Sequence, residues 1–423
     1  MSRIEKLIVG RYNLQFGQGV TLWSGLQPFA ITGTSAYRNG KGVRQAATFY
    51  EEGWQQGVAA TIDMGRGFHL TSFVSRDSNE TLAGGRMEYR KGALAVGTTV
   101  AYTALDDSAE FRSYVYNYNR FAGKQLLNIG VDGVWQWRWL LFYGEVATDH
   151  KGALAAIAGL DVVVRGEDRF GLCWRSYDAQ YHNLHAGGYG IGSTQGENGI
   201  AFNARTRLPL GIDALLSLDQ HSFPTLRYGS YYPSDGEWLR VRLNKRFGHD
   251  TDVLIRYAYR RKERNIPNID SNLYLGEQTV RHQFQANVQT VVGRWRFNTQ
   301  ATCVLFDSEN GGAQRGLLVA QTVRYTMQRL QGVAGVALFD VSDYYARIYY
   351  SESNLQYAWS MPALNGKGLR GHLLAKIALN EHLSLGLKYT ITYYLDQESV
   401  GSGDTLTKGP VRQTLFVQIR WRQ

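Results

Sequence analysis

The sequence predicts an all-β fold, an antiparallel up-and-down transmembrane β-barrel of roughly 20 strands. Three observations support this prediction. Apolar and polar residues alternate in one segment after another along the 423 residues, which is the pattern of strands with one apolar face. Short and long connections between these segments also alternate. Finally, the chain is rich in glycine (47) and tyrosine (27) and poor in proline (7), as expected for many strands joined by turns.

The clearest alternating segment is 382–395. Its apolar residues are at odd-numbered positions, namely Leu383, Leu385, Leu387, Tyr389, Ile391 and Tyr393. Its small and polar residues are at even-numbered positions, namely Ser384, Gly386, Lys388, Thr390 and Thr392. Because successive side chains of a strand point to opposite faces, this segment has one apolar and one polar face. We expect the apolar face to meet lipid.

The connections between the predicted strands alternate in length. Short turns are expected near 64–66, 91–92, 137–138, 165–166, 208–210, 248–250, 292–293, 328–329 and 380–381. Longer connections are expected at 77–80, 106–121, 148–152, 181–197, 220–235, 261–278, 307–313, 341–367 and 396–410. This order is typical of outer-membrane barrels, whose short turns face the periplasm. The segment 354–361 also alternates, and we place it in an extracellular hairpin.

We interpret residues 1–423 as a single outer-membrane β-barrel domain. The long segments 17–52 and 341–367 are expected to fold over or into its lumen. The most apolar run, 153–164, is interrupted by Asp161 and is well short of the ~20 residues that a spanning helix needs. Residues 1–10 lack the apolar core and cleavage site of a signal peptide. Because an outer-membrane protein must be exported, we expect the signal peptide to be missing from this chain.

The formal net charge is +10, and many of the arginine and lysine residues alternate with the apolar residues of the predicted strands. Arginine or lysine on the lipid-facing side of a barrel costs about 2–4 kcal/mol near the bilayer centre. We therefore expect the following side chains to line the lumen: Arg175, Arg240, Arg242, Arg256, Arg260, Arg294, Arg296, Lys388, Arg412 and Arg420. They either cross-link the lumen with acidic residues or select anions, and the sequence leaves both roles open.

Aromatic residues lie near the ends of several predicted strands. Amphipathic rings are enriched at the membrane–water interfaces, where they form girdles around a barrel. We expect such girdles to include Trp135, Trp139, Tyr393 and Trp421.

Neither catalytic residues nor a bound metal or cofactor is expected. His182 and His185 resemble metal ligands but lack a clear third one, so a solvated loop is the better interpretation. The glycine-rich segment 187–192 follows no buried parallel strand, which favours a flexible loop over a nucleotide-binding one. The basic segment 260–264 either contacts lipopolysaccharide phosphates or forms a solvated rim.

Three stretches resemble one protein family. They are GRYNLQFGQGVTLWSG at 10–25, the block 339–370 with Phe339–Asp340 and Gly366–Arg370, and the closing VQIRW at 417–421. These stretches are similar to the helix-hairpin-helix-containing outer-membrane proteins of Bacteroidetes-type bacteria. The intervening hairpins follow the same order, so the resemblance covers essentially the whole chain.

The resemblance implies that this chain is the C-terminal β-barrel portion of such a protein, with a few N-terminal strands missing. The family's precursor begins with a signal peptide and helix-hairpin-helix repeats, and neither is present here. Arg11 replaces the acid usual at that position, and 27–34 lacks the usual Gly-Lys step. The family's DNA contact would reside in the repeats. Nucleic acid is therefore expected as a partner only through an absent N-terminal region.

The function expected from these patterns is that of a non-enzymatic, integral outer-membrane channel or translocation scaffold. Its Arg-lined lumen would favour anionic solutes. The alternative is a non-conducting anchor for periplasmic helix-hairpin-helix DNA-binding domains absent from this chain. An outer-membrane hydrolase and a soluble β-sandwich array are further alternatives. The expected partners are outer-membrane lipid, lipopolysaccharide and periplasmic partner domains.

Overall fold

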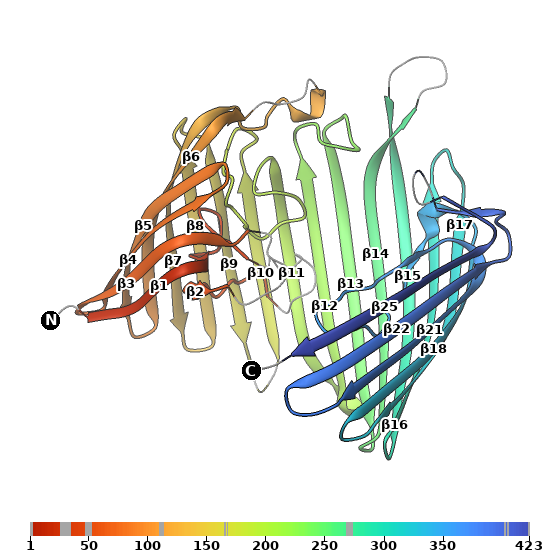
Figure 1. The fold of residues 1–423 in the computed structure, drawn as a ribbon. Coiled ribbons are helices and arrows are strands. Elements are labelled where there is room, and N and C mark those ends of the chain that lie inside the picture. Colours follow the sequence, from red (N-terminus) through yellow and green to blue (C-terminus); the bar gives the residue numbers. More distant parts are fainter. Residues whose placement is uncertain are drawn as a thin grey trace. The chain divides into compact units, whose positions relative to one another are not determined.

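The computed structural model describes residues 3–25, 35–46, 53–109, 114–164, 166, 168–267, 274–401, 403 and 406–421. Within these ranges the chain forms 25 strands and three 3-10 helices. One sheet contains 21 of the strands, and two small sheets contain the other four (Figure 1). No described helix has the length and apolar character needed to cross a membrane. The all-β class predicted from the sequence is confirmed.

Twenty strands of the large sheet have nine residues or more, in agreement with the predicted count. They are β1 (Arg3–Gln15), β3 (Gln55–Gly65), β4 (Phe68–Asp77), β5 (Glu80–Lys91), β6 (Leu94–Ala109), β7 (Gly123–Trp137), β8 (Leu140–Asp149), β9 (Leu154–Val163), β10 (Arg169–Tyr177), β11 (Glu197–Leu208), β12 (Ile212–Phe223), β13 (Ser234–Phe247), β14 (Thr251–Pro267), β15 (Tyr274–Val292), β16 (Trp295–Ser308), β17 (Gln314–Thr326), β18 (Leu330–Val341), β21 (Gly366–Ala378), β22 (Leu383–Tyr394) and β25 (Val411–Trp421).

The remaining elements are short. They are the strands β2 (Gly42–Gln45), β19 (Ile348–Tyr349), β20 (Ala363–Leu364), β23 (Ser399–Val400) and β24 (Thr407–Lys408), and the 3-10 helices η1 (Val115–Asn117), η2 (Pro209–Gly211) and η3 (Tyr344–Ala346). β2 pairs with β1, β19 with β20 and β23 with β24, each in antiparallel fashion.

The chain divides into two compact units. Unit 1 comprises Met1–Thr206, Leu215–Leu239 and Lys262–Glu277, and unit 2 comprises Arg207–Ala214, Arg240–Arg261 and Gln278–Gln423. In unit 1, β1 pairs with β3, and each strand from β3 to β11 pairs with the next one along the chain. In unit 2, β15 to β18, β21, β22 and β25 pair successively. Every one of these pairings is antiparallel, so both units have the up-and-down order of the predicted barrel.

The predicted short turns coincide with the hairpin connections. The turn between β3 and β4, for example, is formed by residues with positive φ, namely Gly65 (83°), Arg66 (56°) and Gly67 (88°). Tight hairpins need this left-handed backbone, because it matches the twist of the flanking strands. In the turn predicted at 165–166, only Gly166 is among the described residues.

Several predicted connections differ from the structure. The connection 77–80 is not long, because β4 ends at Asp77 and β5 begins at Glu80. β14 and β15 extend into the connection predicted at 261–278. The segment 17–52 contains β2, while its residues 26–34 and 47–52 lie outside the described ranges. The stretch 354–361 is not a strand, and it is bracketed by the pair β19 and β20 as expected for a hairpin.

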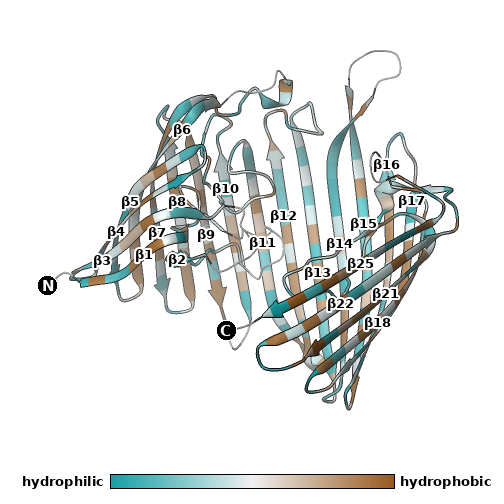
Figure 2. Ribbon diagram, in the orientation of Figure 1, coloured by the Kyte–Doolittle hydropathy of each residue, from teal (hydrophilic) through white to brown (hydrophobic). Residues whose placement is uncertain are grey.

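The two faces of each strand differ sharply in exposure. On β25, Leu415, Val417, Ile419 and Trp421 are between 61% and 71% exposed. Figure 2 shows hydrophobic and hydrophilic residues alternating along the strands. On β10, Leu172 and Trp174 are exposed, whereas Cys173, Arg175 and Tyr177 are almost fully buried. We call the face with exposed apolar side chains the outer face and the opposite one the inner face.

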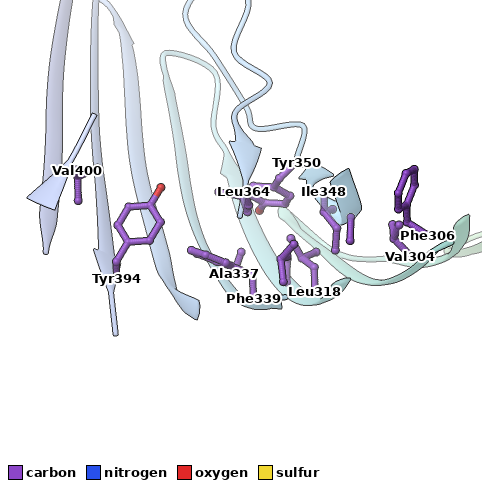
Figure 3. Packing of buried hydrophobic residues seen from close by; sticks show 13 residues of the cluster. Val304, Phe306, Leu318, Ala337, Phe339, Ile348, Tyr350, Leu364, Tyr394 and Val400 are labelled. Carbon is purple, nitrogen blue, oxygen red and sulfur yellow. The ribbon is translucent and has the colours of Figure 1, made fainter. Parts of the chain in front are cut away.

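The hydrophobic clusters lie where connecting segments pack on the inner face. In unit 2, Val304, Phe306, Leu318, Ala337 and Phe339 of β16, β17 and β18 pack with residues of the following connection (Figure 3): Ala346, Ile348, Tyr350 and Leu364. In unit 1, residues of β1 and of the segment after it, including Leu14, Phe16 and Leu22, pack with Val43, Ala59, Phe73, Leu82 and Ala101. Burial of this apolar surface stabilises the segments in place.

Candidate functional site

The segment that follows β1 folds back onto the inner face of unit 1. The amide of Ser24 donates to the carbonyl of Leu14 (2.7 Å), and the amide of Phe16 donates to that of Leu22 (3.2 Å). The Ser24 hydroxyl accepts from the Leu14 amide (2.7 Å). The resulting compact loop, residues 16–24, is called the cap segment. It contains the FGQG motif on which the sequence resemblance rests.

Glu145 of β8 holds the cap segment. Its Oε2 accepts hydrogen bonds from the amides of Gln18 (2.6 Å) and Val20 (3.1 Å). Its Oε1 accepts from the amide (2.7 Å) and the hydroxyl (2.6 Å) of Thr21. Only 3% of Glu145 is exposed. Because buried amides are costly to leave without acceptors, this carboxylate fixes the backbone of the loop.

The structure explains why the first glycine of the FGQG motif, Gly17, has no side chain. Its φ is +54°, and a Cβ built there would lie 2.6 Å from Oε2 of Glu145 and 2.9 Å from Cγ of Asp132. Both the backbone conformation and the lack of space exclude a side chain. The motif therefore reflects the fit of the cap segment against the two carboxylates.

A buried ion-pair network lies beneath the cap segment. Arg86 of β5 pairs with both oxygens of Asp132, including a 2.9 Å bond from Nη2 to Oδ2. It also donates to Glu88 (3.0 Å) and to the Thr99 hydroxyl (3.0 Å). Arg86 and Asp132 are each 6% exposed. The guanidinium is thus fully engaged with protein acceptors.

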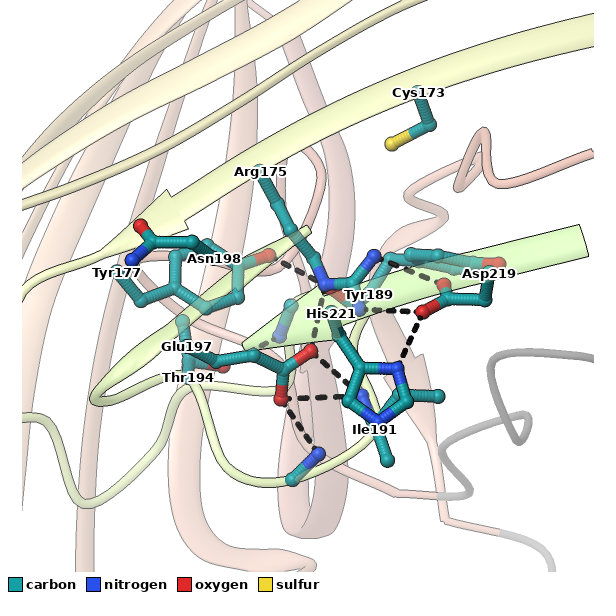
Figure 4. Close-up of polar contacts among 12 residues, drawn as sticks. Cys173, Arg175, Tyr177, Tyr189, Ile191, Thr194, Glu197, Asn198, Asp219 and His221 are labelled. Atoms are coloured by element: carbon teal, nitrogen blue, oxygen red, sulfur yellow. Dashed lines mark hydrogen bonds and ion pairs between the residues drawn. The ribbon is translucent and has the colours of Figure 1, made fainter. Parts of the chain in front are cut away.

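Arg175 is at the centre of a second network (Figure 4). Its Nε donates to Glu197 (2.6 Å), and its Nη1 and Nη2 donate to the two oxygens of Asp219 (2.9 Å each). His221 Nδ1 lies 3.0 Å from Asp219 Oδ1. Arg175 and Glu197 are 0% exposed. Arg175 is on the inner face, and within the described residues it is enclosed by its acids rather than open to solvent; its position in a lumen stays a prediction.

The connection 181–197 packs against the cap segment. The Tyr181 hydroxyl donates to the Val20 carbonyl (3.0 Å), and the Gly187 amide donates to the Gly19 carbonyl (2.8 Å). Glu197 accepts from the amides of Ile191 (2.9 Å) and Gly192 (2.7 Å). The glycine-rich part of this connection is therefore bound to protein groups at several points.

The interpretation of His182 and His185 as a solvated loop is wrong. His182 is 5% exposed, and its amide donates to Asp149 Oδ2 (3.0 Å). His185 Nε2 lies 2.8 Å from Glu80 Oε1. The two histidines hold the loop against strand ends. Across the described ranges, no three His, Cys, Asp or Glu side chains gather in a way that would hold a metal ion.

In unit 2, Glu352 ties the connection between β18 and β21 to the inner face. Its carboxylate pairs with Arg370 of β21, with one bond of 3.2 Å from Nη2, and with Nζ of Lys388 of β22 (3.2 Å). Lys388 is 0% exposed. Burial acts to raise the pKa of Glu352, but the hydrogen bonds and charges of Arg370 and Lys388 outweigh it and lower this pKa.

The residues after Glu352 continue along the same face. The Asn354 carbonyl accepts from Lys376 Nζ (2.8 Å), and the Gln356 carbonyl accepts from Gln418 Nε2 (2.8 Å). Leu355 packs with Val333 and Leu374. Residues 352–356 are called the bolt segment. Its contacts join β18, β21, β22 and β25.

A different set of cations in unit 2 has no acidic partner. Arg242 of β13, Arg256 of β14 and Arg296 of β16 are exposed. In the part of the chain that the structure describes, none of them forms an ion pair with a carboxylate. Arg256 is close enough to Arg240 and Arg242 for their charges to act on it. Arg296 is the cross-strand partner of Arg324 on β17.

The other cations that were predicted to line the lumen differ in their exposure and in their partners. Arg260 is half-buried. Both Arg260 and Arg240 interact with other groups. Arg294, in the turn before β16, and Arg412, on β25, are exposed. Arg420 donates to the Ser384 hydroxyl (3.2 Å) and to the Gln356 side chain. In the basic segment 260–264, Arg264 pairs with Glu277 (2.7 Å).

The four predicted girdle residues are all exposed on their strands or turns. Trp135, Trp139, Tyr393 and Trp421 are between 44% and 67% exposed. Trp135 stacks on Phe142 with 5.6 Å between ring centroids, and Trp421 stacks on His382 at 5.8 Å. Their position in a membrane girdle stays a prediction.

Sequence reasoning did not single out Arg86, Asp132, Glu145, Glu352 or Arg370. The networks of Arg86 and Arg175 are each reflected in the sequence by a glycine, because each guanidinium lies over a glycine. A Cβ on Gly97 would lie 2.2 Å from Arg86 Nη2, and a Cβ on Gly199 would lie 2.5 Å from Arg175 Cζ. A glycine at an inward position of a strand could have indicated a large charged side chain on the neighbouring strand.

Comparisons with known proteins found no matching family model and no matching curated protein. Several solved structures resemble the chain. An anion-selective porin from Comamonas acidovorans is 12% identical, with a TM-score of 0.37, 82% of this chain and 99% of that chain covered. A loop L8 deletion mutant of OmpT, an outer-membrane protein of Vibrio cholerae, is 11% identical, with a TM-score of 0.37 and 78% and 99% covered. The outer-membrane transporter YddB from Escherichia coli is 11% identical, with a TM-score of 0.34 and 99% and 81% covered.

Proposed function

We propose that this chain is a non-enzymatic, integral outer-membrane β-barrel that works as a channel or translocation scaffold and favours anionic solutes. The observation that carries the proposal is the contrast between the two faces of its strands. Exposed apolar side chains line one face, and exposed guanidinium groups without acidic partners in the described ranges lie on the other.

The outer face supports a location in the membrane. Rows of exposed residues such as Leu415, Val417 and Ile419 would be unfavourable in water over so many strands. Strands can cross a bilayer when all their backbone groups pair with neighbouring strands, and apolar outward side chains then contact hydrocarbon. The outer membrane is where bacterial barrels of this strand number occur.

The inner face supports a preference for anions. Arg242 and Arg256 are exposed, and Arg242 is close enough for its charge to act on Arg256. Like charges without acids between them produce a positive local potential, which raises the concentration of anions and lowers that of cations. Arg175 and Lys388 cannot contribute in the same way, because they are fully buried and bonded to carboxylates.

Planar-bilayer recordings on the refolded full chain test the proposal. With a potassium chloride gradient, the reversal potential should indicate chloride preference. A double Arg242→Glu and Arg256→Glu variant should lose or reverse that preference. The control is Arg329→Glu, which makes the same charge change in an exposed short turn. A cation preference that is the same in all three proteins would contradict the proposal.

A second candidate is a non-conducting anchor, favoured by the covering of the inner face in each unit. The cap segment and the connection 181–197 pack on strands of unit 1, and the bolt segment packs on strands of unit 2. In this function the barrel would hold periplasmic domains, and the sequence resemblance suggests helix-hairpin-helix domains that bind DNA.

The two candidates predict different results. An anchor should show no conductance, even at high voltage, and should retain periplasmic partners after affinity purification. A channel should conduct in the absence of any partner. Lipopolysaccharide and outer-membrane lipid are proposed partners in both cases, because either function requires insertion in the outer membrane.

A further inference from the structure

A cluster of tyrosines lies on the long connections of unit 1. Tyr116 of η1 stacks on Tyr114 (5.3 Å between centroids, 8° between planes) and on Tyr231 (5.6 Å, 12°). Tyr228 meets Tyr116 edge-on at 5.6 Å, and Tyr274 meets Tyr231 edge-on at 5.0 Å. Tyr228 is 82% exposed, and Tyr114 is 51% exposed. Monomeric proteins seldom present so many aromatic rings to water without a partner for them.

Two hollows adjoin this cluster. The first, of about 770 Å³, lies between 114–122 and the turn that contains Pro224 and Pro233. The second, of about 370 Å³, is bordered by Arg120, Arg227 and Gln195. Tyr116, Asn119 and Arg120 belong to both. Both volumes fall within the ~300–1,000 Å³ typical of ligand pockets.

The hollows contain cationic and amide groups beside the aromatic rings. Neither Arg120 nor Arg227 forms an ion pair with a carboxylate within the residues that the structure describes. Arg227 lies over the Phe223 ring, with Cζ 3.4 Å from its centroid. Glu197 is near enough for its charge to act on Arg227, but its carboxylate is already bound to Arg175. The Asn117 Oδ1 atom is buried and has no hydrogen-bond partner among the described groups.

The loops around the hollows are held in place by the rest of unit 1. The Asn119 side chain accepts from Gln180 Nε2 (2.8 Å), and the backbone carbonyl of Asn119 lies 3.0 Å from His182 Nε2. The Asn265 side chain of β14 accepts from the Tyr231 amide (2.7 Å). A site whose loops are fixed before binding loses less conformational entropy when a ligand arrives.

From these groups we infer a binding site for an acidic oligosaccharide, which nothing in the proposed channel or anchor function requires. Sugar rings present flat apolar C–H faces that pack on tyrosine rings, and their hydroxyls bond to amides such as that of Asn117. A carboxylate or phosphate on the sugar would pair with Arg120 and Arg227. A neutral apolar ligand would make no use of the two guanidinium groups, so we expect the ligand to carry negative charge.

Calorimetric titration of the refolded full chain in detergent micelles tests the site. The probes are tetragalacturonate, which is acidic, and maltotetraose as its neutral counterpart. We expect tetragalacturonate to bind more tightly than maltotetraose, and its affinity to fall as salt rises. Tyr228→Ala and Arg227→Gln should each weaken binding about three- to tenfold, as expected for losing one aromatic or one charged contact.

The matched control is Tyr344→Ala. Tyr344 is an exposed tyrosine of another connection, and it also has a guanidinium beside it, with Arg347 Cζ 4.2 Å from its ring centroid. Binding should be the same in this variant as in the unaltered chain. Because Tyr228 is exposed, its replacement is not expected to impair folding, and retention of the folded electrophoretic mobility would verify this.

A third titration, with purified lipopolysaccharide in the same micelles, separates the two sources of acidic saccharide. If lipopolysaccharide binds and Tyr228→Ala weakens this binding, the site recognises the carbohydrate of the membrane. If Tyr228→Ala weakens only the binding of the free oligosaccharide, the site recognises a soluble saccharide. Either result supports the site. Equal binding of the acidic and neutral probes, no binding of any probe, or affinities that Tyr228→Ala and Arg227→Gln leave unchanged would overturn the inference.

Discussion

Two kinds of cationic side chain occupy the inner face, and their surroundings differ at the level of single atoms. Arg175 and Lys388 are fully buried and bonded to carboxylates, whereas Arg242 and Arg256 are exposed. A buried ion pair is costly to break, because the charge that remains has lost its water. We therefore assign a structural role to the first pair of residues and the proposed role with anions to the second.

Replacing Glu145 by alanine should release the cap segment. The substitution removes the acceptor of three amides and a hydroxyl, and each buried donor left unsatisfied costs about 1–3 kcal/mol. Hydrogen exchange at Gln18, Val20 and Thr21 should become at least tenfold faster. Glu381→Ala, in an exposed turn, is the control. Unchanged exchange in Glu145→Ala would show that apolar packing alone holds the segment.

Replacing Gly199 by alanine should destabilise unit 1. The new Cβ would lie 2.5 Å from Arg175 Cζ, and the guanidinium cannot move away without breaking its bonds to Glu197 and Asp219. Overpacking of this kind costs about 1–3 kcal/mol, measurable as a lower urea midpoint for the refolded barrel. Gly332→Ala, where a Cβ meets nothing within 4 Å, should change the midpoint little.

The alternation of residues placed Arg175, Lys388 and Arg420 opposite the apolar side chains of their strands, but it did not identify their partners. Glu197 comes from the next strand, and Asp219 comes from β12. Glu352 comes from a connection whose path the alternation of residues does not determine. Parity is a local property of the chain, whereas ion pairs depend on which distant residues the fold brings together, so the first was predictable and the second was not.

At the scale of elements, the hairpins were the most predictable feature. Turn residues such as Gly65–Gly67 and Gly293 have the left-handed backbone that only a few residue types favour. The short strand β2 was not predicted, because four residues show no clear period. β14 and β15 extend beyond their predicted ends, where the basic residues 260–264 suggested a loop. Polar residues do not mark the end of a strand when the neighbouring strand continues to pair with it.

The bolt segment should detach in acid. Because the pKa of Glu352 is lowered in the folded protein, its stabilising contribution is present above the ordinary glutamate pKa and is lost as the pH falls through the lowered value. The protection factors of residues 352–356 against hydrogen exchange, which are corrected for the intrinsic effect of pH, should therefore fall only below that ordinary value. Glu352→Gln should show the accelerated exchange at neutral pH, at a cost of about 3–5 kcal/mol from the two cations left unpaired. Identical protection factors at neutral and acidic pH would contradict this.

At the scale of the whole molecule, the exposed apolar face is the property on which membrane insertion depends. Val417→Arg, in the middle of β25, should impair assembly into liposomes, because a cation facing hydrocarbon there costs about 2–4 kcal/mol. Thr414→Arg makes a similar change on the inner face of the same strand and should be tolerated. Gel-shift measurements of the folded fraction compare the two. Equal yields of folded protein would contradict a lipid contact at Val417.

The class and meander order of the molecule followed from the sequence because the same alternation recurs in strand after strand. Which segments would cover the inner face did not follow, although 17–52 and 341–367 were candidates. The cap and bolt segments are held by a few acids, Glu145 and Glu352 above all. A single carboxylate leaves no periodic pattern, so its role became visible only when its partners were located in space.

The contacts of the bolt segment also impose an order on biogenesis. Five of its charged and amide partners, Arg370, Lys376, Lys388, Gln418 and Arg420, come later in the chain than the segment itself, whereas Arg324, which donates to the Ser353 hydroxyl, comes earlier. During synthesis and export the segment can therefore complete its contacts only after β25, which provides Gln418 and Arg420, has been added. Its locking would mark the completion of folding, and a cysteine pair placed across Gln356 and Gln418 would record that moment as a cross-link.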